Sequence, residues 1–420
     1  MKTLFALIGL ISLTVLPAGA IPNVFFPNGT SPIPVIPAFP RFNADLTEEF
    51  LNQEPWQDGD FSGPWEAEPS LPDLSIRRMS AMPIVFGEVP MSVHSYEGGE
   101  GVQELAIHFL DAGLYFGYLG NDTSREQRDE MRERRIEFSR IFKKLSDALQ
   151  EKLEEGCGRG IEGRIGKTTV LSLGYTDYHW EDFTLRYVER EDHSISLHLF
   201  RKGSEPASLV EDGWRKADRR EREAFLENRV LEPAEGSLEL TDFPVFSQGS
   251  TPFCGIHSLA MVGHYLGLRT NPGMLAASAD FKNNGSASGS DMMEVHRAVA
   301  AELDMKLSLA PRFDLKRVER SLSEGVPVLI WRRVSPAREA YHRSVAGSDL
   351  AFEPLTVEER EALPARDVSG SPSHASVVTG LDPANGAVLY VEPWGHDGWD
   401  RRMRIEEAEA TTYAVFYFKL

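Results

Sequence analysis

The sequence predicts an α+β protein, with a small two-layer α/β domain at the N-terminus and a C-terminal domain in which a helix packs on an antiparallel sheet. Three observations lead to this prediction. An amphipathic helical pattern covers residues 124–155, alternating strand patterns flank it, and a helix-spaced apolar run at 254–267 precedes further strand patterns that extend to residue 419. The chain has 420 residues, which is enough for two or three domains.

The composition disfavours nucleic acid as a partner. The chain has 64 acidic and 44 basic residues and a net charge of −20, so it has no basic surplus for phosphate contacts. We also predict no metal and no cofactor. His179, His193 and His198 lack the spacing of metal ligands, and the run GRGIEGRIGKT follows a helix and has one residue too many between its glycines for a phosphate-binding loop.

Residues 1–20 have the pattern of a secretory signal. Lys2 precedes an apolar run over residues 4–16, and Ala18-Gly19-Ala20 has the small-x-small form of a cleavage site. We therefore expect cleavage after Ala20, a secreted or periplasmic protein, and no membrane span once the signal is removed.

Composition shifts along the chain predict the domain boundaries. Residues 21–79 are rich in proline and predict an extended leader or linker. Residues 80–210 predict an α+β domain of unknown role, with strands at 168–175, 179–188 and 194–201. The charged run over 211–237 predicts a helical connector, and 238–420 the C-terminal domain, in which 335–372 read as a polar, irregular insertion.

The chain contains two cysteines, Cys157 and Cys254. They could form one disulfide, as exported proteins often do, or remain as two free thiols. Their surroundings differ, because glycines flank Cys157 while Cys254 begins an apolar helix. We favour two free thiols.

The stretch around Cys254 has features of a catalytic cysteine. The N-terminus of a helix favours a thiolate over a thiol, and Gln248 lies six residues upstream, where its amide can donate to an oxyanion. His374 begins the first strand of a predicted hairpin and Glu392 ends the second. Because the strands of a hairpin are antiparallel, these two residues are expected at one edge of the sheet. A cysteine, a histidine that moves its proton and an acid that orients the histidine form a set for acyl transfer.

The motifs QGSTPFCGIHSLAMVGHYLG, SHASVVTGLD and LYVEPWG together resemble papain-like cysteine peptidases of bacteria, in particular the stand-alone relatives of the bacteriocin leader-processing peptidases. The resemblance covers about residues 240–420. It implies a peptide or protein substrate, with Gln248 as oxyanion donor, Cys254 as nucleophile, His374 as base and Glu392 as orienting acid.

One position departs from the family pattern. The family usually has aspartate, or asparagine in papain-like relatives, where this chain has Glu392, and glutamate is one methylene longer. Asp382 and Asp397 are therefore alternative orienting acids.

Two other functions use the same residues. The domain could be a binding module that keeps the fold without catalysis, or it could transfer an acyl group to an amine instead of water. Thiol reactivity separates an enzyme from a binding module, because a catalytic thiolate is alkylated much faster than an ordinary thiol.

Overall fold

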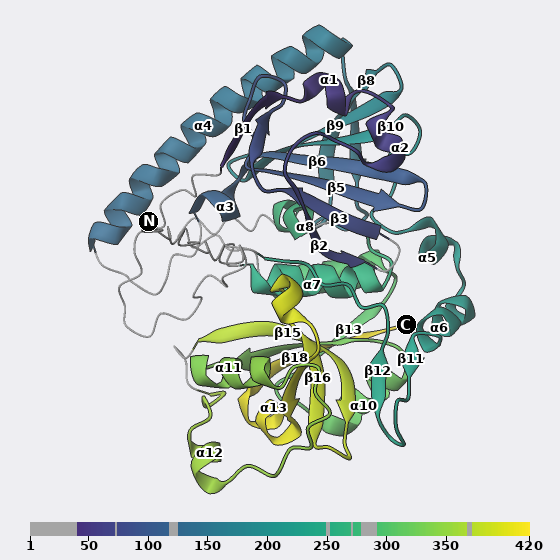
Figure 1. The fold of residues 1–420 in the computed structure, drawn as a ribbon, viewed down its shortest axis with the longest axis vertical. Coiled ribbons are helices and arrows are strands. Elements are labelled where there is room, and N and C mark those ends of the chain that lie inside the picture. The colour runs from purple at the N-terminus through teal and green to yellow at the C-terminus, as the bar shows by residue number, and fades with distance from the viewer. Residues whose placement is uncertain are drawn as a thin grey trace, which may run out of the picture.

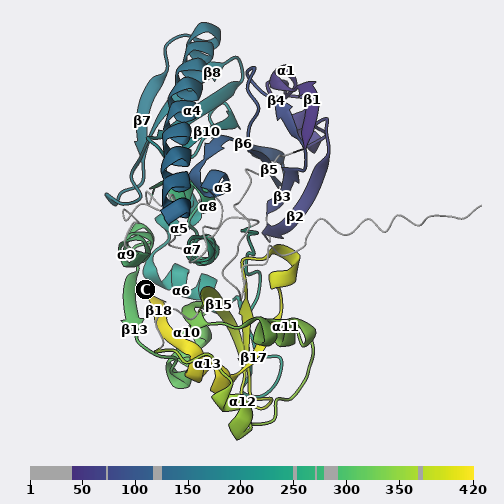
Figure 2. The same ribbon diagram turned by 90° about the vertical axis from the view of Figure 1, so that its left-hand side faces the viewer.

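The computed structural model contains two antiparallel sheets with a buried helix, α7 (Cys254–Tyr265), between them (Figure 1; Figure 2). The structure describes residues 40–71, 74–116, 125–248, 253–269, 272–278, 292–367 and 372–420. The predicted signal and its cleavage site lie outside these ranges. The α+β class is confirmed.

The N-terminal sheet has eight strands in the order β2-β3-β5-β6-β10-β9-β8-β7, and every neighbouring pair is antiparallel. Its strands are β2 (Trp65–Leu71), β3 (Leu74–Met79), β5 (Ser92–Gly98), β6 (Gly101–Asp111), β7 (Ile161–Ile165), β8 (Leu173–Trp180), β9 (Phe183–Arg190) and β10 (Ser194–Arg201). The predicted strand at 168–175 is misplaced, because residues 166–172 form a loop between β7 and β8.

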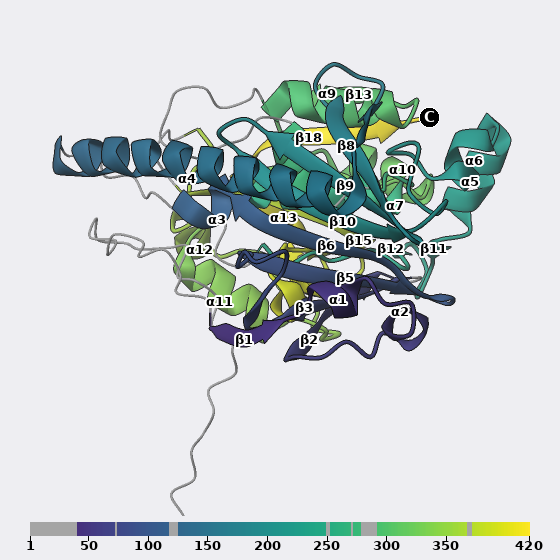
Figure 3. The same ribbon diagram turned by 90° about the horizontal axis from the view of Figure 1, so that it is seen from above.

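One long helix, α4 (Arg125–Cys157), covers one face of this sheet, and the short helix α3 (Ala112–Phe116) precedes it (Figure 3). The predicted apolar face of the helix is confirmed. Phe138, Phe142 and Leu149 are buried in a core together with apolar residues of the central strands β6, β9 and β10. Two layers, a sheet and a helix, therefore make up this domain, as the pattern predicted.

The prediction of an extended leader over residues 21–79 is wrong from residue 40 onward. Residues 40–79 contain β1 (Arg41–Asp45), the short helices α1 (Thr47–Phe50) and α2 (Pro55–Asp58), and strands β2 and β3 of the large sheet. β1 pairs in parallel with β4 (Met82–Ile84). Phe50 and Trp56 are fully buried, so a few aromatic anchors compensate for the weak periodicity of this segment.

The C-terminal sheet has the order β11-β12-β15-β14-β18-β13, and β16 and β17 extend it from β15. Its strands are β11 (Val230–Leu231), β12 (Leu238–Leu240), β13 (Lys306–Ala310), β14 (Val328–Arg333), β15 (Ser373–Asp382), β16 (Ala387–Val391), β17 (Arg401–Arg404) and β18 (Thr412–Lys419). The other helices of this domain are α8 (Pro272–Ser278), α9 (Met292–Glu302), α10 (Leu315–Ser323), α11 (Pro336–Ser344), α12 (Val357–Glu361), α13 (Ile405–Thr411) and the 3-10 turn η1 (Gly395–Gly398).

Two further predictions need correction. The insertion at 335–372 is not irregular throughout, because it contains α11 and α12, and α11 starts with Pro336 in the first turn, where proline is well tolerated. The connector consists of two helices, α5 (Asp212–Lys216) and α6 (Arg219–Glu227), and β11 already belongs to the C-terminal sheet.

The hydrophobic core of the C-terminal domain extends into the N-terminal domain, which also has a core of its own around α4. Ile76 and Val188 of the N-terminal sheet belong to the same buried cluster as Leu259 of α7 and Trp214 of the connector. Since α7 is apolar around most of its circumference, it is covered by both domains. None of the helices in the described ranges combines the length and the apolar composition needed to cross a membrane.

The loop that resembled a phosphate-binding loop holds a carboxylate of the chain itself. The backbone N–H groups of Lys167 and Thr168 donate to the Glu302 carboxylate over 3.0–3.3 Å, and Glu302 is buried at the end of α9. The adjacent pair between Lys167 Nζ and Asp304 Oδ1, at 2.6 Å, is half exposed. The loop thus joins the N-terminal domain to the C-terminal one.

We expect Glu302→Ala to destabilise the protein by about 1–3 kcal/mol, because it removes the buried carboxylate that accepts from the backbone N–H groups of Lys167 and Thr168. Urea unfolding of the full chain measures this effect. Asp304→Ala is the matched control, because Asp304 lies two residues after Glu302 and pairs with the side chain of the same Lys167. It should change the unfolding free energy less, because its ion pair is solvated. Equal effects of the two substitutions would contradict the buried role of Glu302.

Candidate active site

Cys254 is the first residue of α7, directly after the N-cap residue Phe253. The first backbone hydrogen bond of the helix runs from His257 N to Phe253 O at 2.8 Å, so the unpaired N–H groups of the first turn lie around the thiol. Cys254 is partly exposed, whereas the rest of α7 is almost entirely buried. A rigid, buried helix therefore presents the sulfur at its positive end.

His374 is the second residue of β15, and its side chain hydrogen-bonds the Cys254 thiol. Ser258, one turn after Cys254, donates its hydroxyl to Ala375 O at 3.0 Å. This bond attaches α7 to β15 beside the histidine. The structure therefore places the cysteine of the helix beside the histidine of the strand, as the sequence predicted.

Glu392 follows the last residue of β16, and its Oε2 lies 2.7 Å from His374 Nε2. The pairing of β15 with β16 shifts by one residue between Val378 and Gly380, which leaves Thr379 as an extra residue in β15. Glu392 consequently lies beside Ser376, whose hydroxyl donates to Glu392 Oε1 at 2.8 Å. Glu392, rather than Asp382 or Asp397, is the acid in contact with the histidine.

Burial and charge act in opposite directions on these groups. Burial raises the pKa of the Cys254 thiol, but the charge and hydrogen bond of His374 outweigh it, with help from the Ala375 N–H, and the pKa lies below its ordinary value. Burial lowers the pKa of His374, but Glu392 and the sulfur raise it to about 10. Burial likewise raises the pKa of Glu392, while His374 and Arg332 hold it below its usual range. These directions favour a thiolate–imidazolium pair beside an ionised carboxylate.

Trp394 covers the histidine. The centroid of the Trp394 ring lies 4.9 Å from that of His374. The guanidinium carbon of Arg401 lies over the same indole, 5.3 Å from its centroid. An aromatic ring against the imidazole limits the access of water to the ion pair and restricts the motion of the histidine.

Gln248 is buried beside the segment that follows Glu392. Its backbone N–H donates to Pro393 O at 2.9 Å, and Ser247 bridges to Trp394. The structure therefore brings all four predicted site residues into one region of the C-terminal domain. Residues 249–252, between Gln248 and the nucleophile, lie outside the described ranges.

Cys157 is the last residue of α4, in the N-terminal domain. Both cysteines are free thiols, so they do not form a disulfide with each other. Burial raises the pKa of the Cys157 thiol, the opposite of the net shift at Cys254. In the part of the chain that the structure describes, no group of three or more His, Cys, Asp or Glu side chains has the arrangement of a metal site.

The N-terminal domain borders this site. A Cβ atom added to Gly113, in α3, would lie 2.3 Å from the Phe253 ring, directly before the nucleophile. Strand β2 contacts η1, the turn that follows Trp394. Only a residue without a side chain fits at Gly113, so the N-terminal domain packs tightly against the start of α7.

Sequence reasoning missed several residues around the site. Arg332 is fully buried and contacts Glu392, Ser376 and Glu339, and Ser258 ties the helix to the strand. One signal was available in the sequence, because an arginine near the end of the apolar run VPVLIWRR is unusual in a buried strand.

Comparisons with known proteins relate the C-terminal part of the chain to a peptidase family. Residues 240–419 match the model of the Peptidase_C39 like family. Over these residues the chain is similar to C39-like cysteine peptidases. A crystal structure from Bacillus anthracis, described as that of a candidate C39-like peptidase, is similar with 16% sequence identity and a TM-score of 0.30, and the match covers 44% of this chain and 98% of that one. Among curated proteins, none matches the chain.

The protein should be alkylated selectively at Cys254. Between about pH 6 and 8, we expect iodoacetamide to label Cys254 at least tenfold faster than Cys157, because the two thiol pKa values move in opposite directions. Mass spectrometry of the labelled peptides measures both rates in one sample.

His374→Ala provides the control for this prediction. It removes the main cause of the lowered pKa, so labelling of Cys254 should slow while that of Cys157 stays the same. Equal, slow labelling of the two thiols in the unmodified protein would refute the presence of an activated thiolate.

Proposed function

We propose that the protein is an exported cysteine peptidase that hydrolyses amide bonds in peptide or protein substrates with Cys254, His374, Glu392 and Gln248. The observation that carries this proposal is the unbroken series of contacts from the Cys254 thiol through His374 to the Glu392 carboxylate at 2.7 Å. Those contacts connect a nucleophile, a proton carrier and an orienting acid.

The geometry supports a two-step reaction. The Cys254 thiolate attacks the carbonyl carbon, the carbonyl electrons move to oxygen, and the N–H groups at the start of α7 with the Gln248 amide stabilise the oxyanion. His374 then gives its proton to the leaving amine as the C–N bond breaks, which leaves an acyl–enzyme. A water molecule, deprotonated by His374, attacks the acyl carbon, the C–S bond breaks, and the acid is released while the thiolate–imidazolium pair is restored.

The lowered pKa of Cys254 favours an enzyme over a binding module, because a protein that only binds has no use for a buried ion pair at a partly exposed thiol. Transfer to an amine would use the same first step. The products formed with and without an added amine separate hydrolysis from transfer.

Export is part of the proposal and is supported by the sequence of residues 1–20. The charged start, the apolar run and the Ala18-Gly19-Ala20 site are the features of a cleaved signal. Cell fractionation and N-terminal sequencing of the mature chain test it, and a protein that starts at Met1 in the cytoplasm would refute it.

Cys254→Ala should abolish peptide hydrolysis by the full chain without unfolding it, because the side chain is small and partly exposed. The assay is mass spectrometry of new N-termini in a peptide library, with circular dichroism as the test of folding. Cys157→Ala is the matched control and should keep full activity. Activity in the folded Cys254→Ala protein would refute the assignment of the nucleophile.

His374→Ala should reduce kcat by about a thousandfold or more, and Glu392→Ala by a smaller factor, because an orienting group contributes less than the group that transfers the proton. Steady-state rates on one cleaved peptide give the ranking. A greater loss at Glu392 would mean that its charge, and not only its orientation of the histidine, is required.

A further inference from the structure

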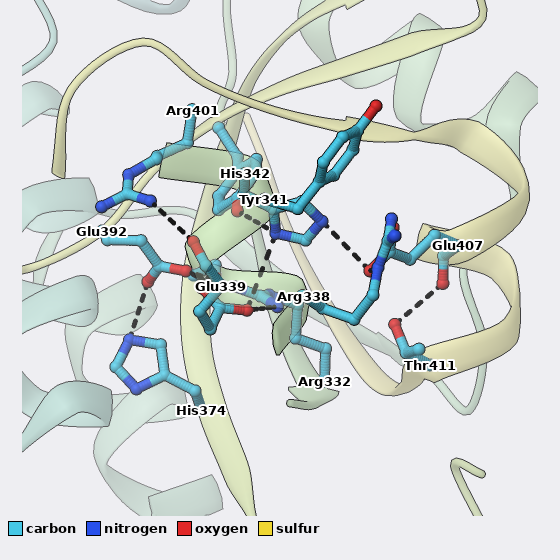
Figure 4. Close-up of polar contacts among 12 residues, drawn as sticks. Arg332, Arg338, Glu339, Tyr341, His342, His374, Glu392, Arg401, Glu407 and Thr411 are labelled. Carbon is cyan, nitrogen blue, oxygen red and sulfur yellow. Dashed lines mark hydrogen bonds and ion pairs between the residues drawn. The ribbon is translucent and has the colours of Figure 1, made fainter. Parts of the chain in front are cut away.

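A buried series of alternating charges continues from the site into the C-terminal domain (Figure 4). Beyond Glu392 it includes Arg332, then Glu339 and His342 of α11, and then Glu407 of α13. All five side chains are at least nine-tenths buried. Of this series, only the first member, Glu392, is among the proposed peptidase residues.

Arg332 makes three different polar contacts from one guanidinium group. Nη2 donates to Glu392 Oε1 at 2.5 Å, Nε donates to Ser376 Oγ at 3.0 Å, and Nη1 donates to Glu339 Oε1 at 2.6 Å. Arg332 is also the cross-strand neighbour of His374, so the arginine and the histidine project from adjacent strands on the same face. The planar fork of arginine fixes the directions of these bonds.

The contacts of Glu392 leave it no freedom to turn. Its Oε1 accepts from Arg332 and Ser376, and its Oε2 lies against His374. Glutamate has one more rotatable bond than the aspartate that is usual at this position in the resembling family, and that bond would otherwise let the carboxylate move away from the imidazole. The two donors on Oε1 compensate for the extra methylene.

Stability alone does not account for Arg332. A buried ion pair is often no more stabilising than apolar residues of the same volume, since desolvation offsets the attraction. Here Arg332, which is paired with Glu339, also binds the carboxylate of Glu392, and that carboxylate contacts His374. Glu339 in turn is held by His342, whose Nδ1 also hydrogen-bonds Tyr390 at 2.8 Å.

We propose that Arg332, held by Glu339, is a positioning residue that fixes the Glu392 carboxylate on His374 and so maintains the thiolate–imidazolium pair. This inference rests on the proposed peptidase function. Arg332 acts through Glu392 and touches no reacting atom. Its chemistry is that of a clamp on the orienting acid, which allows a glutamate to replace the shorter residue.

The test removes the clamp without leaving a buried charge unpaired. In the full chain, the double substitution Arg332→Met/Glu339→Leu replaces both partners with apolar residues, so the fold is expected to persist. The readout is the pH dependence of Cys254 alkylation, which requires no substrate. With Glu392 free to turn, the acid limb of the profile should move up by about one pH unit, and the labelling rate at pH values well below the midpoint of that limb should fall about tenfold.

A matched control removes a similar buried pair elsewhere. Arg186 forms a two-bonded pair with Asp177 in the N-terminal sheet, at 2.8 and 2.9 Å. Arg186→Met/Asp177→Leu should leave the alkylation profile unchanged, whatever its effect on unfolding. If both double variants shift the profile equally, the effect is a general loss of packing and the proposal is overturned.

The single variant Arg332→Lys keeps the positive charge but loses the planar guanidinium that binds Glu392, Ser376 and Glu339 at once. It provides the test if the double variant does not fold. An upward shift of its acid limb supports the clamp, and an unchanged profile overturns it. The proposed function fails separately, through activity in Cys254→Ala. An inactive Cys254→Ala protein combined with an unshifted Arg332 variant would refute the clamp alone.

Discussion

The site depends on keeping three charged groups in contact where little water reaches them. The pair between His374 Nε2 and Glu392 Oε2, at 2.7 Å, is buried on both sides. Burial by itself would neutralise both groups, so His374 remains charged because Glu392 and the Cys254 sulfur stabilise it, and Glu392 because His374 and Arg332 do. The lowered thiol pKa of Cys254 follows from this pair, and so does the need for a rigid strand, a rigid helix and an aromatic cover.

The two domains meet around that requirement. Helix α7 has so much apolar surface that one sheet cannot cover it, and the N-terminal sheet supplies the second covering layer through a shared core. The close contact of Gly113 with Phe253 fixes where the helix begins, and the loop around Lys167 holds the end of α9 through Glu302. The N-terminal domain therefore supports the position of Cys254 as well as the stability of the fold.

The residues of the site could be predicted because each stands at the boundary of a strongly patterned element. Cys254 begins an apolar helix, and His374 and Glu392 flank a hairpin. The structure of segment 40–79 could not be predicted, because its strands are short and polar on one side and its stability comes from contacts with residues distant in the sequence. Arg332 was missed for a related reason. A sequence shows that an arginine is out of place in an apolar strand, but only the fold shows which carboxylates surround it.

The extra residue in β15 has a consequence for how such sites can vary. Side chains in a strand alternate between two faces, so each one-residue shift in pairing exchanges the face that a partner residue presents. Without the bulge at Thr379, the pairing near the turn would continue and place Glu392 opposite Val377, on the face away from His374. The bulge therefore determines whether an odd or an even number of residues must separate the histidine from the acid for both side chains to lie on the same face of the sheet. A relative that loses this single residue would need its carboxylate one position earlier or later, and its acid would lie in a different column of any alignment.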